Sequence, residues 1–222
     1  MTIDGPSGSG KGTVGRAAAR ALGWALLDSG ALYRLVALAA RRAAHSLDDE
    51  PALARLAEDI DIRFGARDLD EEIVWLDGKD VTGAIRTEEA GNDASKVAGL
   101  PAVRAALLER QRRFAVPPGL VADGRDMGTV VFPEAEVKIF LTASAAERAA
   151  RRHKQLKEKG VAATLAALSL EIAERDRRDS TRAIAPLVAS ADAVLLDTTG
   201  VSIESVVEQV LALARSRLVP GP

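Results

Sequence analysis

Short apolar runs alternate along most of the chain with long, Ala-rich segments whose apolar residues recur at the spacing of a helix face. Runs of this length are typical of buried strands. We expect strands at 2–3, 25–27, 120–122, 137–141 and 193–196, and helices at 11–22, 32–44, 101–113, 145–159, 164–178 and 202–218. The alternation predicts an α/β fold with a central parallel sheet flanked by helical crossovers.

An aspartate follows four of the predicted strands, at Asp4, Asp28, Asp123 and Asp197. In an open parallel sheet, ligands bind at the carboxyl ends of the strands. Asp is also an ordinary turn residue, so any single one of the four can be explained by local turn chemistry. Together they indicate the edge of the sheet at which function is to be sought.

The pattern changes between residues 60 and 81, where short β-like runs flank an Asp-Gly turn at Asp77 and Gly78. Asp-Gly between such runs is typical of a β-hairpin. We therefore expect a small antiparallel lobe inserted into the α/β body. At 222 residues the chain is expected to form a single domain over 1–222.

Composition excludes several kinds of catalytic site. The chain has no Cys, and its only histidines are His45 and His153, far apart in sequence. Disulfides, thiolate metal sites and a Cys nucleophile are therefore excluded. Two distant histidines also argue against a zinc site with several imidazoles and against a Ser-His-Asp triad. Any catalysis has to come from carboxylates, hydroxyls, Lys, Arg and backbone amides.

Net charge and hydropathy indicate which binding partners and which cellular compartment to expect. Thirty Lys and Arg against thirty-two Asp and Glu give a net charge of −2, which argues against nucleic acid as a partner. No apolar run approaches the roughly 18 residues that span a bilayer, and the N-terminus lacks the features of a signal peptide. We expect a cytoplasmic protein that binds no membrane.

The strongest motif lies between the first predicted strand and the first predicted helix. Glycines let the backbone approach a phosphate chain closely, the helix N-terminus adds a positive dipole end, and a following Lys supplies a cation. A phosphate loop usually has Ser or Thr directly after this Lys. Here Gly12 intervenes and Thr13 follows, an ending that resembles nucleoside monophosphate kinases. The motif consists of Gly5, Pro6, Ser7, Gly8, Ser9, Gly10, Lys11, Gly12 and Thr13.

A phosphate loop is compatible with a GTPase switch, an ATPase motor or a small-molecule kinase. The guanine-specific Asn-Lys-x-Asp element is absent, since the single Asn, Asn92, precedes Asp93. Between Arg148 and Arg182 there are ten basic and five acidic residues. Arg binds phosphate oxygens bidentately and stays ionised, so this concentration favours a second, phosphate-bearing substrate.

Several motifs, in order from residue 2 to about 218, together resemble bacterial cytidylate kinase. They are the phosphate loop, Leu27-Asp28-Ser29-Gly30-Ala31-Leu32-Tyr33-Arg34, Ile85-Arg86-Thr87, Ala94-Ser95 with Arg104, the stretch Ala122-Asp123-Gly124-Arg125-Asp126-Met127-Gly128-Thr129-Val130-Val131-Phe132-Pro133, and Glu174-Arg175-Asp176 with Asp179 and Arg182. The resemblance implies a P-loop kinase fold with a monophosphate-binding insert at about 58–100 and a helical lid at about 145–160.

The resemblance also implies roles for individual residues. ATP, with Mg²⁺, is expected at the phosphate loop and Arg148, with Thr13 meeting the metal directly or through water. Four residues are expected to act on the transferred group: Lys11, Arg125, Arg152 and Arg182. Nine are expected to bind CMP or dCMP: Ser29, Arg34, Ser95, Arg104, Arg125, Asp126, Arg175, Asp179 and Arg182.

The expected reaction is transfer of the ATP γ-phosphoryl group to CMP and dCMP without a general base. Two alternatives remain from the residues alone. One is a related kinase that acts on UMP, AMP or an alcohol such as shikimate, and the other is a regulator that binds nucleotide without catalysis. No sustained heptad pattern is evident, so we expect a monomer.

Overall fold

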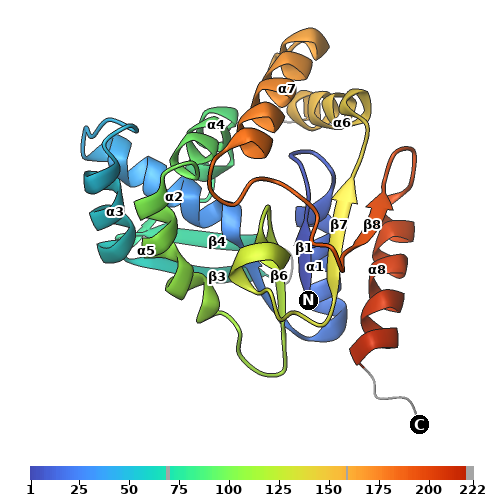
Figure 1. Ribbon diagram of the computed structural model, residues 1–222. Helices are drawn as coiled ribbons and strands as arrows, with labels where there is room; N and C mark the ends of the chain where they lie inside the picture. The colour runs from blue at the N-terminus through green and yellow to red at the C-terminus, as the bar shows by residue number, and fades with distance from the viewer. Residues whose placement is uncertain (69–70, 159, 219–222) are drawn as a thin grey trace. The chain divides into compact units, whose positions relative to one another are not determined.

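The computed structural model describes residues 1–68, 71–158 and 160–218 of the chain, which divides into two units. Unit 1 consists of residues 1–28 and the chain from 112 onward, and unit 2 consists of residues 29–111. Each unit has its own sheet (Figure 1). The residues expected to form the inserted lobe, 58–100, lie within unit 2.

The sheet of unit 1 has five parallel strands in the order β2-β6-β1-β7-β8. The strands are β1 (Thr2–Asp4), β2 (Ala25–Asp28), β6 (Leu120–Gly124), β7 (Lys138–Thr142) and β8 (Val194–Asp197). All five predicted strands are confirmed, with ends that differ by one or two residues. The register pairs Asp28 with Asp123 and Thr142 with Asp197, so the four aspartates do lie at the carboxyl ends of strands.

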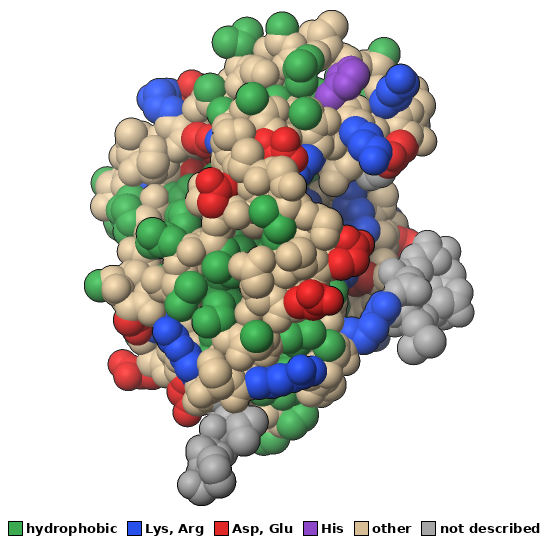
Figure 2. All heavy atoms as spheres, turned by 90° about the vertical axis from the view of Figure 1, so that its right-hand side faces the viewer, with side chains coloured by type: hydrophobic (Ala, Val, Ile, Leu, Met, Phe, Trp, Pro, Cys, Tyr) green, Lys and Arg blue, Asp and Glu red, His purple; other side chains and the backbone are tan. Residues whose placement is uncertain are grey.

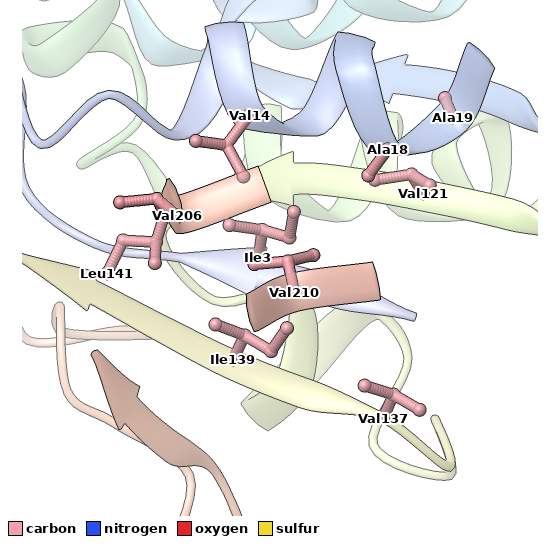
Figure 3. Packing of buried hydrophobic residues seen from close by; sticks show 10 residues of the cluster. All are labelled: Ile3, Val14, Ala18, Ala19, Val121, Val137, Ile139, Leu141, Val206 and Val210. Atoms are coloured by element: carbon pink, nitrogen blue, oxygen red, sulfur yellow. The ribbon is translucent and has the colours of Figure 1, made fainter. Parts of the chain in front are cut away.

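Helices α1 (Lys11–Leu22) and α8 (Ile203–Leu218) contribute to the main core of unit 1. Val14 and Ala18 of α1 and Val206 and Val210 of α8 pack with side chains of β1, β6 and β7 around Ile3 (Figure 3). The helix α1 ends at Gly23, whose φ of +66° is the left-handed conformation common at helix C-termini. Amphipathic spacing therefore places both helices on the face of the sheet toward which Ile3 points.

Thr2 and Asp4 point to the opposite face, because successive side chains of a strand alternate. That face meets a short π-helix, η2 (Met127–Val131). Unit 1 is completed by α6 (Ala145–Glu158) and α7 (Leu165–Thr181), which the sequence predicted. The predicted end of α6 at Lys159 lies outside the described residues.

Unit 2 combines helices with the predicted antiparallel lobe. Its three-stranded sheet has the order β3-β4-β5, formed by β3 (Ile62–Asp68), β4 (Glu71–Leu76) and β5 (Lys79–Asp80), with antiparallel pairing throughout. Helix α2 (Ser29–Arg42) begins three residues earlier than predicted, and α5 (Pro101–Arg112) agrees with its prediction. A short turn of 3₁₀-helix, η1, covers Ala84–Arg86.

Two helices of unit 2 were missed by the sequence analysis: α3 (Glu50–Asp59) and α4 (Glu88–Val97). Both have an N-cap signal that is visible in the sequence. Asp49 accepts a hydrogen bond from the N–H of Ala52, with Pro51 in the first turn, and Thr87 accepts one from the N–H of Ala90. Caps of this kind satisfy N–H groups that have no partner within the helix.

On the face of unit 1 that Figure 2 shows, Lys and Arg side chains lie among Asp and Glu side chains, without a continuous patch of one sign. No helix in the described parts of the chain is both long and apolar enough to span a bilayer.

Candidate active site

The segment from Gly5 to Gly10 joins β1 to α1, and its glycines have backbone conformations that other residues rarely adopt. φ is +150° at Gly5, +79° at Gly8 and +93° at Gly10. A Cβ atom at Gly5 would lie 2.0 Å from the carbonyl oxygen of Leu141, so any side chain there would displace the loop from β7. Gly10 precedes α1 without a capping side chain, so no side chain of the cap covers the first N–H groups of the helix. The segment therefore has the backbone of an anion-binding loop.

Lys11, the first residue of α1, is buried. Its Nζ donates to the carbonyl oxygen of Pro6 at 3.3 Å and lies 4.0 Å from Oδ1 of Asp123. Burial, and then the charge of Arg125, lower the pKa of Lys11 to about 7, while burial raises the pKa of Asp123. Both shifts favour the neutral forms, so the ion pair does not fully offset the loss of hydration. An incoming phosphate would supply the anion that a charged Lys11 needs.

Thr13 is exposed on the first turn of α1. In the described parts of the chain, no group of three or more His, Asp or Glu side chains is arranged to hold a metal ion. Mg²⁺ in nucleotide sites is usually held by substrate phosphates, waters and only one or two protein groups. Contact of the Thr13 hydroxyl with Mg²⁺, directly or through water, therefore stays a prediction.

The structure brings together five predicted substrate residues that come from two distant segments of unit 1. Arg125 Nε donates to Asp179 Oδ2 at 3.0 Å, and Arg182 Nη2 lies 3.7 Å from Asp126 Oδ1. Arg175 Nη1 lies 3.4 Å from Oγ of Ser7 in the phosphate loop. Both ion pairs are largely buried. The loop after β6 and the last turns of α7 thus form one charged group beside the phosphate loop.

The arginines of α6 lie in different surroundings. Arg148 is buried: its Nη1 donates to the carbonyl oxygen of Ser7 at 3.0 Å, and its guanidinium holds both carboxylate oxygens of Asp176 in α7, at 3.0 and 2.5 Å. Arg152 donates to Gln155 within its own helix at 3.1 Å. Direct contact of Arg148 and Arg152 with ATP stays a prediction.

The other four predicted substrate residues belong to unit 2. Ser29 Oγ donates to Gln111 Oε1 at 2.7 Å, and Arg34 Nη1 donates to the carbonyl oxygen of Ile85 at 3.3 Å. Ser95 is buried in α4. The guanidinium of Arg104 lies 5.8 Å from the centre of the Tyr33 ring, the geometry of a cation–π contact, and it donates to the carbonyl oxygen of Ala98. These side chains are held by their own unit; their contact with a substrate stays a prediction.

Four residues near these groups were absent from the predicted site. Asp123 pairs with Lys11, Asp176 pairs with Arg148, Asp4 binds the start of η2, and Gln111 binds Ser29. A signal existed for Asp4 and Asp123, because each is an aspartate at a strand end. Asp176 belongs to the motif that contains Arg175 and Asp179, but its partner Arg148 could not be read from it. Gln111 had no local signal, since Ser29 is distant in sequence.

Comparison with known proteins agrees with this geometry. The sequence model described as "Cytidylate kinase" matches residues 1–216. The chain belongs to the cytidylate kinase family. Three relatives carry the name cytidylate kinase. The chain is 58% identical to the protein of Azotobacter vinelandii over 222 residues, which are 100% of this chain and 97% of the relative. It is 57% identical to the protein of Methylococcus capsulatus over 216 residues (97% of this chain, 96% of the relative) and 58% identical to the protein of Klebsiella pneumoniae over 218 residues (98% and 96%).

Membership of the cytidylate kinase family confirms that the protein is an enzyme, a P-loop kinase that binds nucleotides. The alternative of a regulator without catalysis is therefore set aside. The five-stranded parallel sheet and its flanking helices are the fold that the resemblance implied.

Proposed function

We propose that the protein transfers the γ-phosphoryl group of ATP to CMP and dCMP. The observation that carries this proposal is the charged group beside the phosphate loop, in which Arg175 approaches Ser7 while Arg125 and Arg182 are each paired with a carboxylate. Guanidinium groups held in this way are suited to a second anionic substrate next to the donor phosphates. The name of the relatives, cytidylate kinase, supports CMP as that substrate.

In the proposed step an oxygen of the CMP phosphate forms a bond to the γ-phosphorus, and the bond from that phosphorus to the β–γ bridging oxygen breaks. CDP and ADP are the products. The second pKa of a phosphate monoester is about 6, so the acceptor is largely dianionic at neutral pH and no proton has to be removed. The reaction therefore needs positioning and charge neutralisation rather than a general base.

The phosphate loop and Lys11 are proposed to hold the donor phosphates, with Arg148 and Arg152 as further contacts. When bound with ATP, Mg²⁺ would neutralise charge on the β and γ phosphates, with Thr13 as its protein contact. Arg125 and Arg182 are proposed to hold the acceptor phosphate. Arg125 already donates to the carboxylate of Asp179, and Nε of Arg182 donates to the carbonyl oxygen of Ala185, so both guanidinium groups are oriented before substrate arrives.

Asp126 is proposed to select the base. Cytosine has an amino donor at N4 where uracil has an acceptor, so a carboxylate would accept from cytosine and repel uracil. Asp179 with Arg175 is proposed to bind the sugar. If Asp179 contacts the 2′-hydroxyl, its substitution will change the use of CMP more than that of dCMP. The family resemblance assigns Ser29, Arg34, Ser95 and Arg104 to CMP as well.

An acceptor panel tests the function. ADP release from Mg-ATP is measured with CMP, dCMP, UMP, AMP, GMP and shikimate separately, beside a reaction without acceptor. We expect strong activity with CMP and dCMP, weak activity with UMP and none above background otherwise. Activity that is highest with AMP or shikimate, or absent with every acceptor, would contradict the proposal. Lys11→Ala serves as the matched inactive control, with its fold verified by circular dichroism.

A further inference from the structure

Asp4, the last residue of β1, carries a buried carboxylate that the proposed reaction does not use; its exposed fraction is 5%. Its Oδ1 accepts the N–H of Met127 at 2.8 Å, and its Oδ2 accepts the N–H of Gly128 at 2.8 Å. These two amides begin the π-helix η2, more than 120 residues further along the chain. Asp4 therefore caps η2 from another element of unit 1.

The residue in the usual capping position is Asp126, and its side chain makes no capping hydrogen bond. Its Oδ1 lies instead 3.7 Å from Nη2 of Arg182, within the group proposed to bind the acceptor. An N-terminal carboxylate normally turns back to the first N–H groups of its helix. Because Asp4 already satisfies these groups, the carboxylate of Asp126 can be directed elsewhere.

The backbone on both sides of Asp126 is closely packed. A Cβ atom at Gly128 would lie 2.9 Å from Thr2 Oγ1 and 3.4 Å from Asp4 Oδ2, and one at Gly124 would lie 2.8 Å from Cγ of Met127. Asp4 is also joined directly to Gly5, the first residue of the phosphate loop. One strand end thus connects the loop proposed to bind the donor with the loop that bears Arg125 and Asp126.

The surroundings of Asp4 disfavour the charged form of its carboxyl group. Burial raises its pKa to about 7, the charges of Asp126 and Asp123 act in the same direction, and the two backbone N–H groups oppose them. The ammonium of Lys138, whose side chain approaches Gly128, is 2.8 Å from Asp192. The two backbone N–H bonds are thus the main compensation for the buried carboxylate.

We propose that Asp4 is a positioning residue for acceptor recognition: by capping η2 in place of Asp126, it holds Arg125 and Asp126 in the orientation that binds the phosphate and base of CMP. This inference rests on the proposed function. Asp4 itself touches neither substrate in this scheme. Both hydrogen bonds of its carboxylate go to η2, so its side chain is expected to affect the use of the acceptor more than that of ATP.

The test is Asp4→Asn, which keeps the size of the side chain but replaces one acceptor oxygen with an NH₂ group that cannot accept an N–H. We expect KM for CMP to rise about tenfold and the CMP-over-UMP ratio of kcat/KM to fall about tenfold, while KM for ATP stays within about twofold. The control is Asp192→Asn, a carboxylate-to-amide change that removes the Lys138 ion pair and leaves the N–H groups of η2 untouched. We expect Asp192→Asn to keep the wild-type KM for CMP, the KM for ATP and the CMP-over-UMP ratio of kcat/KM.

A double-mutant cycle separates positioning from a general structural effect. If Asp4 acts through Asp126, adding Asp4→Asn to Asp126→Asn will not lower the CMP-over-UMP ratio further. An additive loss, or a fall in kcat with unchanged KM and base preference, would overturn the inference. Failure of the wild-type protein to phosphorylate CMP would instead overturn the proposed function.

Hydrogen exchange keeps the inference testable if Asp4→Asn does not fold. In the ligand-free wild-type protein the amides of Met127 and Gly128 should exchange slowly, because both are bonded to a buried carboxylate. Fast exchange at both amides would show that Asp4 does not hold η2.

Discussion

At the scale of single residues, the most consequential environment is that of Lys11. A buried ammonium loses hydration, and its nearest carboxylate, Asp123, is itself buried at 4.0 Å. Burial and then the charge of Arg125 lower the pKa of Lys11 far below its ordinary value, so we expect much of the ligand-free protein to carry this side chain neutral at pH 8. A polyphosphate beside Lys11 favours the charged form and therefore raises this pKa.

ATP binding at pH 8 should consequently take up protons. Calorimetry in two buffers with different ionisation enthalpies measures this uptake, because the apparent binding enthalpy then differs between them. We expect a difference for the wild-type protein and a much smaller one for Lys11→Met. Equal binding enthalpies in both buffers for the wild-type protein would contradict a neutral Lys11 that gains its proton when ATP binds.

Asp126 allows a prediction about specificity. In Asp126→Asn the side-chain amide can present either a carbonyl oxygen or an NH₂ group, so it accommodates cytosine and uracil alike. We expect the CMP-over-UMP ratio of kcat/KM to fall about tenfold, which corresponds to about 1.4 kcal/mol. Steady-state kinetics with both acceptors measures the ratio. A variant that rejects UMP as strongly as the wild-type protein would show that another group selects the base.

At the scale of elements, Arg148 connects α6 with both the phosphate loop and α7. Arg148 of α6 donates to the carbonyl oxygens of Ala143 and Ser7 and binds both oxygens of Asp176 in α7. Arg148 Cβ also lies 3.0 Å from the position of a Cβ atom at Gly8. The phosphate loop is therefore packed against α6, and α7 fixes the orientation of the arginine.

Removing the carboxylate should loosen this connection. In Asp176→Asn the guanidinium loses a charged, two-point partner, and hydrogen bonds to charged groups contribute about 1.5–3 kcal/mol. We expect KM for ATP to rise about tenfold while KM for CMP changes less, as measured by initial rates with each substrate varied. Glu174→Gln is the matched control, because Glu174 is exposed on α7 and pairs with Arg177 and Arg178 of the same helix. If both variants behave alike, the connection has no bearing on ATP binding.

At the scale of the whole molecule, we expect the core cluster of unit 1 to contribute strongly to stability. Ile139 of β7 is 1% exposed within the cluster that joins the sheet to α1 and α8. Ile139→Ala removes buried methyl groups and leaves a cavity, so we expect the free energy of unfolding to fall by about 2–5 kcal/mol in urea titrations. Leu195→Ala, at a residue that is 64% exposed on edge strand β8, should change it by about 0.5 kcal/mol or less. Similar losses in the two variants would mean that this cluster does not dominate stability.

The sequence by itself determined those features that depend on near neighbours along the chain. The phosphate loop is recognisable because its backbone conformation can be adopted only by glycines at fixed spacing, as the φ values of Gly5, Gly8 and Gly10 show. The five strands and α1 were predicted because apolar periodicity reflects burial on one or both faces. The short helices α3 and α4 were missed although Asp49 and Thr87 cap them and their apolar residues recur at helical spacing, because ten residues offer few repeats of that spacing.

Only the tertiary structure decided which of the charged residues meet. Arg125 and Asp179 are 54 positions apart, Asp4 and Met127 are 123 apart, and no local pattern relates either pair. The resemblance assigned Arg148 to ATP, a contact that stays a prediction, and the structure adds that Arg148 donates to Ser7 and Asp176, each brought to it by a different element. Such contacts follow from the order of the strands and the packing of helices on the sheet, because these alone set the distance between side chains that the sequence keeps far apart.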